Sequence, residues 1–144
     1  MANPLPVAVA GATLDDVHRR RSRRRSVEVL LERAQRLAPE DAQLLHQVYA
    51  QGLSIARVAE TTGRHPRTLQ RKVERLVRRM RSPSFRFIAQ HLELLPRELQ
   101  PTARDRFLYG LSLREIARRG RTSLHKVRTR VHTLETLIRA GALV

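Results

Sequence analysis

Cysteine and tryptophan are absent from this 144-residue sequence, and aromatic residues make up only 3% of it. Without cysteine there is no disulfide framework, no zinc finger and no thiol nucleophile. No run approaches the roughly 18 consecutive apolar residues of a membrane-spanning helix, so we expect no membrane association. The length accommodates one ordinary domain or two small ones, and is too short for a dinucleotide-binding enzyme with a substrate domain.

Acidic residues are also scarce. Asp and Glu total 13 against 29 Lys and Arg, which gives a formal net charge of +16. All but two of the basic residues are Arg, the exceptions being Lys72 and Lys126. A chain this basic attracts polyanions, of which nucleic acid is the commonest. The Arg bias suits phosphate and guanine, with which a guanidinium forms paired hydrogen bonds, although a GC-rich genome would produce the same bias.

Candidates for catalysis or metal binding are few. The six His residues show no metal-ligand spacing, and no glycine-rich phosphate loop follows a strand pattern. Asp15 and Asp16 stand beside an Arg-rich run, where they balance charge. We therefore expect no enzyme activity, no catalytic residue, no metal site and no cofactor.

The N-terminal segment lacks an apolar period. Residues 1–12 carry no charge, and residues 18–25 contain six Arg. Like charges at this density repel, so we expect residues 1–25 to form a flexible arm that is disordered when free. The arm is interpreted either as a phosphate-binding element or as a solvated tether, and its basic side chains are Arg19, Arg20, Arg21, Arg23, Arg24 and Arg25.

From Ser26 onward apolar residues recur with helical spacing, and no segment alternates with the period of a strand. Ser26 and Pro39 mark the expected starts of two helices. A short helix capped by Ser54 is expected to end at Gly63, and a longer helix to run over residues 66–80. The sequence therefore predicts an all-α fold.

The second half of the chain repeats the first with a shift of 58 residues. The run Gly52-Leu53-Ser54 aligns with Gly110-Leu111-Ser112, and the apolar positions of the long helix align as well. A repeat of this length indicates one structural unit used twice.

The predicted organisation is two tandem three-helix units after the arm. The first unit covers residues 26–83, and the second covers residues 84–144. A connecting helix is predicted over residues 84–95, where it would pack the two units together.

Each predicted unit has the order of a helix-turn-helix: a short capped helix, a tight turn and a longer basic helix. Ala59 and Ala117 are small enough to let the two helix axes cross closely. The turn needs a positive φ, which Gly63 provides in the first unit. In the second unit Gly120 falls one place early, so Arg121 stands at the position of the turn glycine.

The segment from Phe107 to Ala117 reads Phe-Leu-Tyr-Gly-Leu-Ser-Leu-Arg-Glu-Ile-Ala, with Leu95-Pro96 before it and a Ser123-capped helix after it. This pattern resembles region four of bacterial sigma factors of the sigma-seventy type, and residues 52–73 are similar. The resemblance covers about residues 37–80 and 95–139. Response-regulator output domains and resolvase tails share much of the pattern.

In the sigma family this module reads promoter DNA near the minus-thirty-five element and contacts RNA polymerase. The resemblance therefore implies duplex DNA and RNA polymerase as partners. Thr62 and Arg64 depart from the family, which prefers apolar residues around the turn. No segment resembles the sigma region that melts promoters, so we expect a DNA-binding protein of two sigma-like modules and not a complete sigma factor.

The helical period divides each long helix into an apolar face and an outer face. Arg suits guanine and Gln suits adenine, so outward side chains near the helix start are predicted to contact base edges. These predicted base-reading residues are Arg67, Gln70, Arg71, His125, Lys126 and Arg128. Basic residues beside them, Arg64, Lys72, Arg75, Arg121 and Arg130, are predicted to contact phosphates. The alternative is that all of them form a solvated helix face.

Three functions fit these patterns. The first is a bacterial or phage transcription regulator or sigma-like factor that binds duplex DNA in the bacterial cytoplasm, associated with the nucleoid. The second is an RNA-binding or ribosome-associated basic protein, for which the Arg-rich arm would suffice. The third is a protein-interaction module of the transcription machinery, in which the second unit holds a protein instead of DNA.

Overall fold

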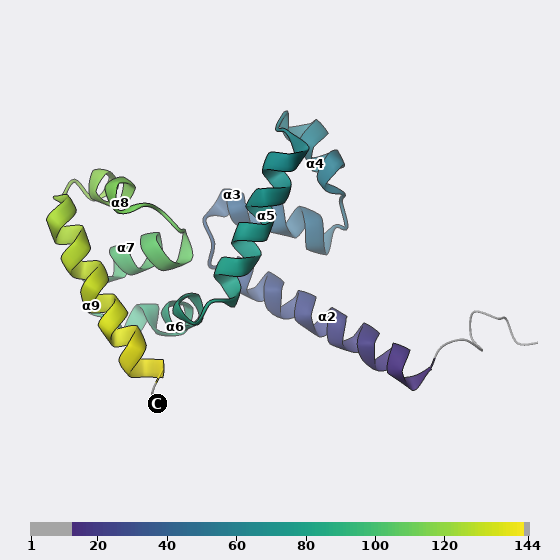
Figure 1. The fold of residues 1–144 in the computed structure, drawn as a ribbon, viewed down its shortest axis with the longest axis horizontal. Helices are drawn as coiled ribbons and strands as arrows, with labels where there is room; N and C mark the ends of the chain where they lie inside the picture. Colours follow the sequence, from purple (N-terminus) through teal and green to yellow (C-terminus); the bar gives the residue numbers. More distant parts are fainter. Residues whose placement is uncertain (1–12, 143–144) are drawn as a thin grey trace, which may run out of the picture.

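The computed structural model describes residues 13–142, which form helices and turns without a strand (Figure 1). The predicted all-α fold is therefore confirmed. Of the elements, η1 and η3 are single π-helical turns and η2 is a 3-10 turn. None of the helices in residues 13–142 has the length and apolar character needed to cross a membrane. In chain order the elements are α2 (Leu14–Ala34), α3 (Pro39–Leu45), η1 (His46–Ala50), α4 (Ile55–Thr62), α5 (Pro66–Arg81), α6 (Pro83–His91), η2 (Leu92–Leu94), α7 (Gln100–Ala103), η3 (Arg104–Leu108), α8 (Leu113–Arg119) and α9 (Leu124–Ala142).

Helix α2 begins earlier than the sequence predicted. The backbone N–H of Asp16 donates to the Thr13 hydroxyl at 3.2 Å, and the Asp16 carboxylate accepts from the backbone N–H of Thr13 at 3.2 Å. This reciprocal cap satisfies two backbone donors, while Asp15 and Asp16 lie at the positive end of the helix dipole. At the other end, Leu30 and Ala34 are buried in the core.

The prediction of a flexible arm is therefore wrong for residues 14–25. Their charges repel, but like-charge pairs on a helix cost only about 0.2–0.5 kcal/mol each. The Thr13 cap at the start of α2 and the burial of Leu30 and Ala34 near its end offset this repulsion. Residues 1–12 of the predicted arm lie outside the described residues.

The predicted shift of 58 residues also relates two parts of the structure, a first repeat (residues 37–80) and a second repeat (residues 95–138). The turns η1 and η3 occupy corresponding positions. The N–H of Gln51 donates to the carbonyl of His46 at 3.0 Å, and the N–H of Tyr109 donates to that of Arg104 at 2.9 Å. The repeat thus extends to an unusual π-helical turn that the sequence did not predict.

The short helices of the two repeats begin in the same way. Gly52 and Gly110 precede them with φ of 68° and 70°. The hydroxyls of Ser54 and Ser112 then each accept a backbone N–H three residues on, at 3.2 Å. Glu115 completes a reciprocal cap with Ser112, as predicted. The predicted starts of these two short helices are confirmed, whereas the start predicted at Ser26 is wrong because Ser26 lies inside α2. The name helix-turn-helix for these units stays a prediction.

One hydrophobic core runs through both repeats. Phe85 and Ile88 of α6 are fully buried, and α6 packs against α5, α9 and η3. The predicted connecting helix is therefore α6, which ends at His91 and not at residue 95. The core crosses the predicted boundary at residue 83 and includes Leu76, Met80, Phe85, Ile88, Ala103, Leu108, Leu134 and Ile138.

A smaller cluster holds α8 against the first turns of α9. It consists of Ile116, Val127 and Val131, with Phe107 packed against this cluster and the main core. Figure 1 shows the two repeats as neighbouring lobes, with α2 extending away from them. The N-terminal half of α2 thus has no core of its own.

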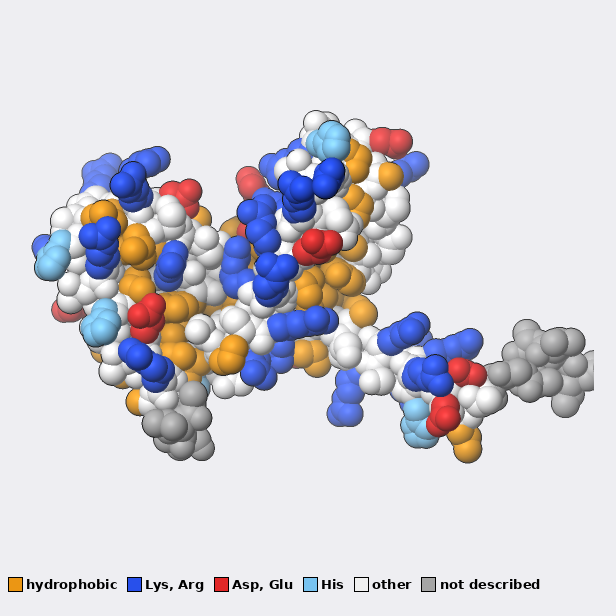
Figure 2. All heavy atoms as spheres, in the orientation of Figure 1, with side chains coloured by type: hydrophobic (Ala, Val, Ile, Leu, Met, Phe, Trp, Pro, Cys, Tyr) orange, Lys and Arg blue, Asp and Glu red, His pale blue; other side chains and the backbone are white. Residues whose placement is uncertain are grey.

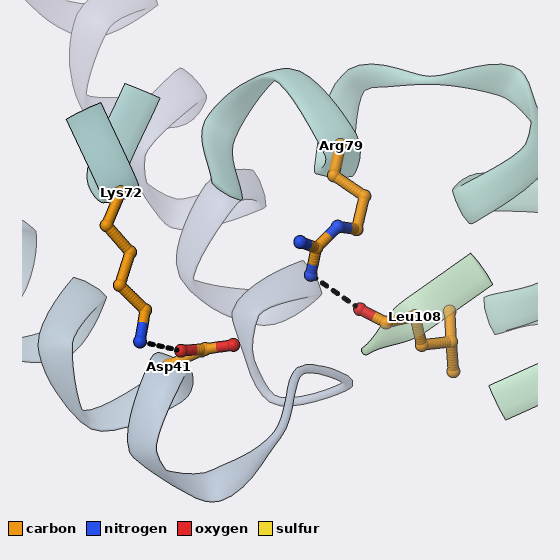
Figure 3. Close-up of polar contacts among 4 residues, drawn as sticks. All are labelled: Asp41, Lys72, Arg79 and Leu108. Atoms are coloured by element: carbon orange, nitrogen blue, oxygen red, sulfur yellow. Dashed lines mark hydrogen bonds and ion pairs between the residues drawn. The ribbon is translucent and has the colours of Figure 1, made fainter. Parts of the chain in front are cut away.

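Arg79 links the end of α5 to the second repeat. Its Nη1 donates a hydrogen bond to the carbonyl oxygen of Leu108 at 3.2 Å (Figure 3). Desolvation lowers the pKa of the Arg79 guanidinium from its ordinary value; Asp41 opposes this shift and Arg75 adds to it. The guanidinium stays charged at any physiological pH, so it remains a hydrogen-bond donor to Leu108 throughout that range.

Candidate nucleic-acid interface

The turn between α4 and α5 is the most exposed part of the first repeat. Gly63 ends α4 with φ 68°, as predicted, because L side chains avoid this left-handed conformation. His65 caps α5 through Nδ1, which accepts the backbone N–H of Arg67 at 3.2 Å. Every residue over 61–68 is exposed. The first turn of α5, with the positive end of its dipole, is therefore open to an anionic ligand.

The three predicted base-reading residues of the first repeat are exposed on α5. Arg67 and Arg71 form no ion pair or side-chain hydrogen bond within residues 13–142, whereas Gln70 Nε2 donates to Glu74 Oε1 at 3.1 Å. Arg71 also lines an open hollow with Thr68, Glu74, Arg75 and Arg78. The two Arg side chains are thus free to contact a ligand, while Gln70 must leave Glu74 to do so.

Two further exposed Arg side chains continue the line of Arg67 and Arg71 toward the end of α5, and the sequence analysis did not name either of them. Arg78 lies seven residues after Arg71, and Arg81 lies three after Arg78, so all three share one side of the helix. Arg78 and Arg81 are exposed. Their helical spacing from Arg71 could have identified both residues from the sequence. We call Arg67, Arg71, Arg75 and Arg78 the α5 row; Arg81 lies beyond this row, where the last turn of α5 meets α2.

The predicted phosphate contacts of the first repeat differ in their surroundings. Arg64 and Arg75 are exposed. Lys72 instead forms an ion pair with Asp41 of α3, with 3.0 Å between Nζ and Oδ1 (Figure 3). The two side chains are only 28% and 13% exposed. The charge of Lys72 is therefore balanced within the fold, where it holds α3 against α5.

In the second repeat His125, Lys126 and Arg128 are exposed on the first turns of α9, and Arg130 is half-buried. Ser123 caps this helix by accepting the backbone N–H of Lys126 at 3.2 Å. Arg121 is exposed and has φ 49°. All the predicted site residues of this repeat are thus near the start of α9.

The outer face of α9 is less basic than that of α5. Thr129 and Thr136 stand at the positions that Arg71 and Arg78 occupy in the first repeat. The Thr129 hydroxyl donates to the carbonyl of His125 at 3.0 Å, and that of Thr136 to the carbonyl of His132 at 3.0 Å. The two repeats share a fold but present different chemistry.

The six predicted arm residues, Arg19, Arg20, Arg21, Arg23, Arg24 and Arg25, are all exposed on α2. Within residues 13–142 only two ion pairs are found, Lys72 with Asp41 and Arg104 with Asp105. Most of the Arg side chains therefore have no carboxylate partner in this part of the chain. Figure 2 shows Lys and Arg side chains gathered along α5 and over α2 on one face of the molecule.

Comparisons of the chain with protein-family models, with curated proteins and with solved structures found no match.

Proposed function

We propose that the chain is a transcription regulator or sigma-like factor that binds duplex DNA sequence-specifically and acts with RNA polymerase in the bacterial cytoplasm, at the nucleoid. The first repeat reads bases through α5, in the manner that the resemblance to sigma region four implies. α2 contributes phosphate contacts.

One observation carries the proposal. The start of α5 is an exposed, capped helix end, and it continues into a row of unneutralised Arg side chains on one face. A helix N-terminus binds phosphate, and a major groove admits a helix whose Arg side chains pair with guanine. A row that extends along most of a helix matches the repeated charges of a polyanion better than a single small anion.

The aromatic residues favour duplex DNA over single-stranded RNA. Proteins that read single-stranded RNA stack its bases on exposed aromatic rings. Here Phe85 is buried and the other four aromatic side chains, Tyr49, Phe87, Phe107 and Tyr109, are half-buried. Stacking of single-stranded bases therefore has no fully exposed Phe or Tyr ring to use among these side chains.

A second role is supported for the second repeat. The threonine-rich outer face of α9 carries fewer basic side chains than that of α5, yet the helix keeps its cap and its packing. This face suits a protein contact with polymerase, or a few phosphate contacts, better than base reading. The two repeats would then divide DNA reading and partner binding between them.

The experiment is a pair of binding measurements on the full chain. Fluorescence anisotropy compares labelled duplex DNA with single-stranded RNA over a series of salt concentrations, and selection from a random duplex pool tests for preferred sites. We expect tighter binding to duplex at every salt concentration, and a recurring sequence in the selected pool. Tighter binding to the RNA would support the RNA-binding alternative, and weak binding to both at low salt would support a protein-interaction module.

A further inference from the structure

A second basic feature lies where α2 meets the end of α5. An open hollow of about 360 Å³ is lined there by Ser22, Arg25, Ser26, Arg33 and Arg81, together with two aliphatic side chains of α2. We call it the corner hollow. All of its polar residues lie along α2 except Arg81, which reaches it from the last turn of α5.

The lining of the corner hollow selects for an anion. Three guanidinium groups and two hydroxyls line it, and no carboxylate does. The Ser26 hydroxyl already donates to the carbonyl oxygen of Ser22 at 2.9 Å, so the guanidinium groups and Ser22 are the donors left for a ligand. The neighbouring hollow between α2 and α6 differs, because Glu32 lies among its Arg side chains. The corner hollow is therefore the more electropositive of the two, and its donors match phosphate oxygens.

Part of this lining is held in position by the fold. Arg33 is half-buried, and its Nη1 donates to the carbonyl oxygen of Met80 at 3.3 Å. A guanidinium has five N–H donors, so the remaining ones are available to a ligand. Arg25 and Arg81 are exposed and have no ion pair within the described residues. One fixed and two adjustable Arg side chains thus converge on one hollow.

The position of the hollow along α5 points to a phosphate-bearing ligand that also meets the start of the helix. Arg67 and Arg81 lie fourteen residues apart, which is about 21 Å along a helix. The major groove is only about 12 Å wide. If α5 crosses the groove with its first turn inside, its last turn therefore lies beyond the groove and near the flanking phosphate backbone.

We infer that the corner hollow binds the phosphodiester backbone of the same duplex whose groove receives the start of α5. This inference rests on the proposed function and adds a specific second contact to it. The contact fixes the direction in which α5 crosses the groove, because it holds the C-terminal end of the helix against one strand. It carries no sequence information of its own.

The test compares two double variants of the full chain. Arg25→Gln with Arg81→Gln empties the hollow of its exposed charges, and Arg97→Gln with Arg139→Gln removes the same charge from exposed positions elsewhere. Affinity for a fluorescein-labelled duplex of random sequence is measured over a salt series. We expect the log–log salt slope of the corner variant to fall by about 0.9 for each phosphate that the variant no longer neutralises, and that of the control to stay at the parent value.

Equal slopes for the two variants, whether both unchanged or both reduced, would overturn the inference. A corner variant that loses binding to phosphatidylglycerol vesicles but keeps the parent duplex slope would also overturn it, in favour of a lipid headgroup. In each case retained site preference in the variants leaves the proposed function standing. A parent chain that does not prefer duplex to single-stranded RNA contradicts the proposed function itself.

Discussion

Arg121 has in the second repeat the left-handed backbone that Gly63 has in the first, with φ of 49° and 68°. The two residues are 58 positions apart and follow equivalent short helices. Arg121 is the one non-glycine residue of positive φ among residues 13–142. The second repeat therefore keeps the turn geometry without the residue that adopts it with little strain.

Arg121→Gly is expected to raise the free energy of unfolding by about 1 kcal/mol, since it removes the left-handed strain of a side chain. For a chain of this size that corresponds to a rise in Tm of about 2–4 °C. Gly63→Ala is the matched control and should lower stability by about 1 kcal/mol. No heavy atom lies within 4 Å of a Cβ added at Gly63, so backbone strain is its only cost. Thermal melts measure both; a destabilised Arg121→Gly would show that the Arg side chain has a structural role.

Gly110→Ala is expected to cost more stability than Gly52→Ala, although the two glycines are equivalent and have nearly the same φ. A Cβ at Gly110 would overlap the Arg79 guanidinium, whereas the space around Gly52 is open. Moving Arg79 breaks its hydrogen bond to Leu108, so the extra cost is about 1 kcal/mol. Urea denaturation measures the difference. In an Arg79→Ala background the two substitutions should cost the same, and a persistent difference would exclude Arg79 as its cause.

Arg71→Ala is expected to weaken binding to the preferred duplex by about 1–3 kcal/mol and to relax discrimination at one base position, because it removes one bidentate hydrogen-bonded pair. Arg128→Ala on α9 should cost less, and should affect preferred and random duplex alike. Competition binding with both duplexes measures this, on variants whose melts match the parent. A larger specific loss for Arg128→Ala would reverse the assignment of the two repeats.

Replacing Arg19, Arg20, Arg21, Arg23 and Arg24 with Gln is expected to weaken duplex binding broadly and to flatten its salt dependence. Gln keeps the helix propensity of Arg, so circular dichroism should show α2 retained. The preferred sequence should survive, since these side chains are assigned to phosphates. Loss of that preference, measured by repeated site selection, would mean that α2 reads bases.

Lys72→Ala is expected to reduce duplex affinity less than Arg75→Ala, because the Lys72 ammonium is already paired with Asp41 at 3.0 Å. Arg75 is exposed and unpaired within the described residues. Anisotropy titrations at one salt concentration compare the two. If Lys72→Ala were the more damaging variant despite an unchanged melt, Lys72 would have to exchange Asp41 for phosphate on binding.

The sequence predicted the features that local chemistry decides. Ser54 and Ser112 cap helices through their own hydroxyls, and Gly63 provides the positive φ that its turn requires. These interactions span only a few residues, so spacing alone reveals them. The repeat was also visible in the sequence, because both copies preserve the same apolar and glycine positions.

Interactions between distant residues were not predictable in this way. Arg79 and Leu108 are 29 positions apart, and Lys72 and Asp41 meet only because α3 packs on α5. The start of α2 is a different case. The pattern Thr13-x-x-Asp16 is a capping signal in the sequence, but charge repulsion in residues 18–25 argues against a helix there. The helix persists because core packing at Leu30 anchors it.

The core shared by the two repeats has a mechanical consequence. Phe85, Ile88 and Leu134 belong to one packed interior, so buried contacts and not a free linker join α5 to α9. We therefore expect the distance between the two helices to change little when a ligand binds. A ligand that touches both must match that spacing, and a duplex with an extra base pair inserted between its two contact points would lose one of them.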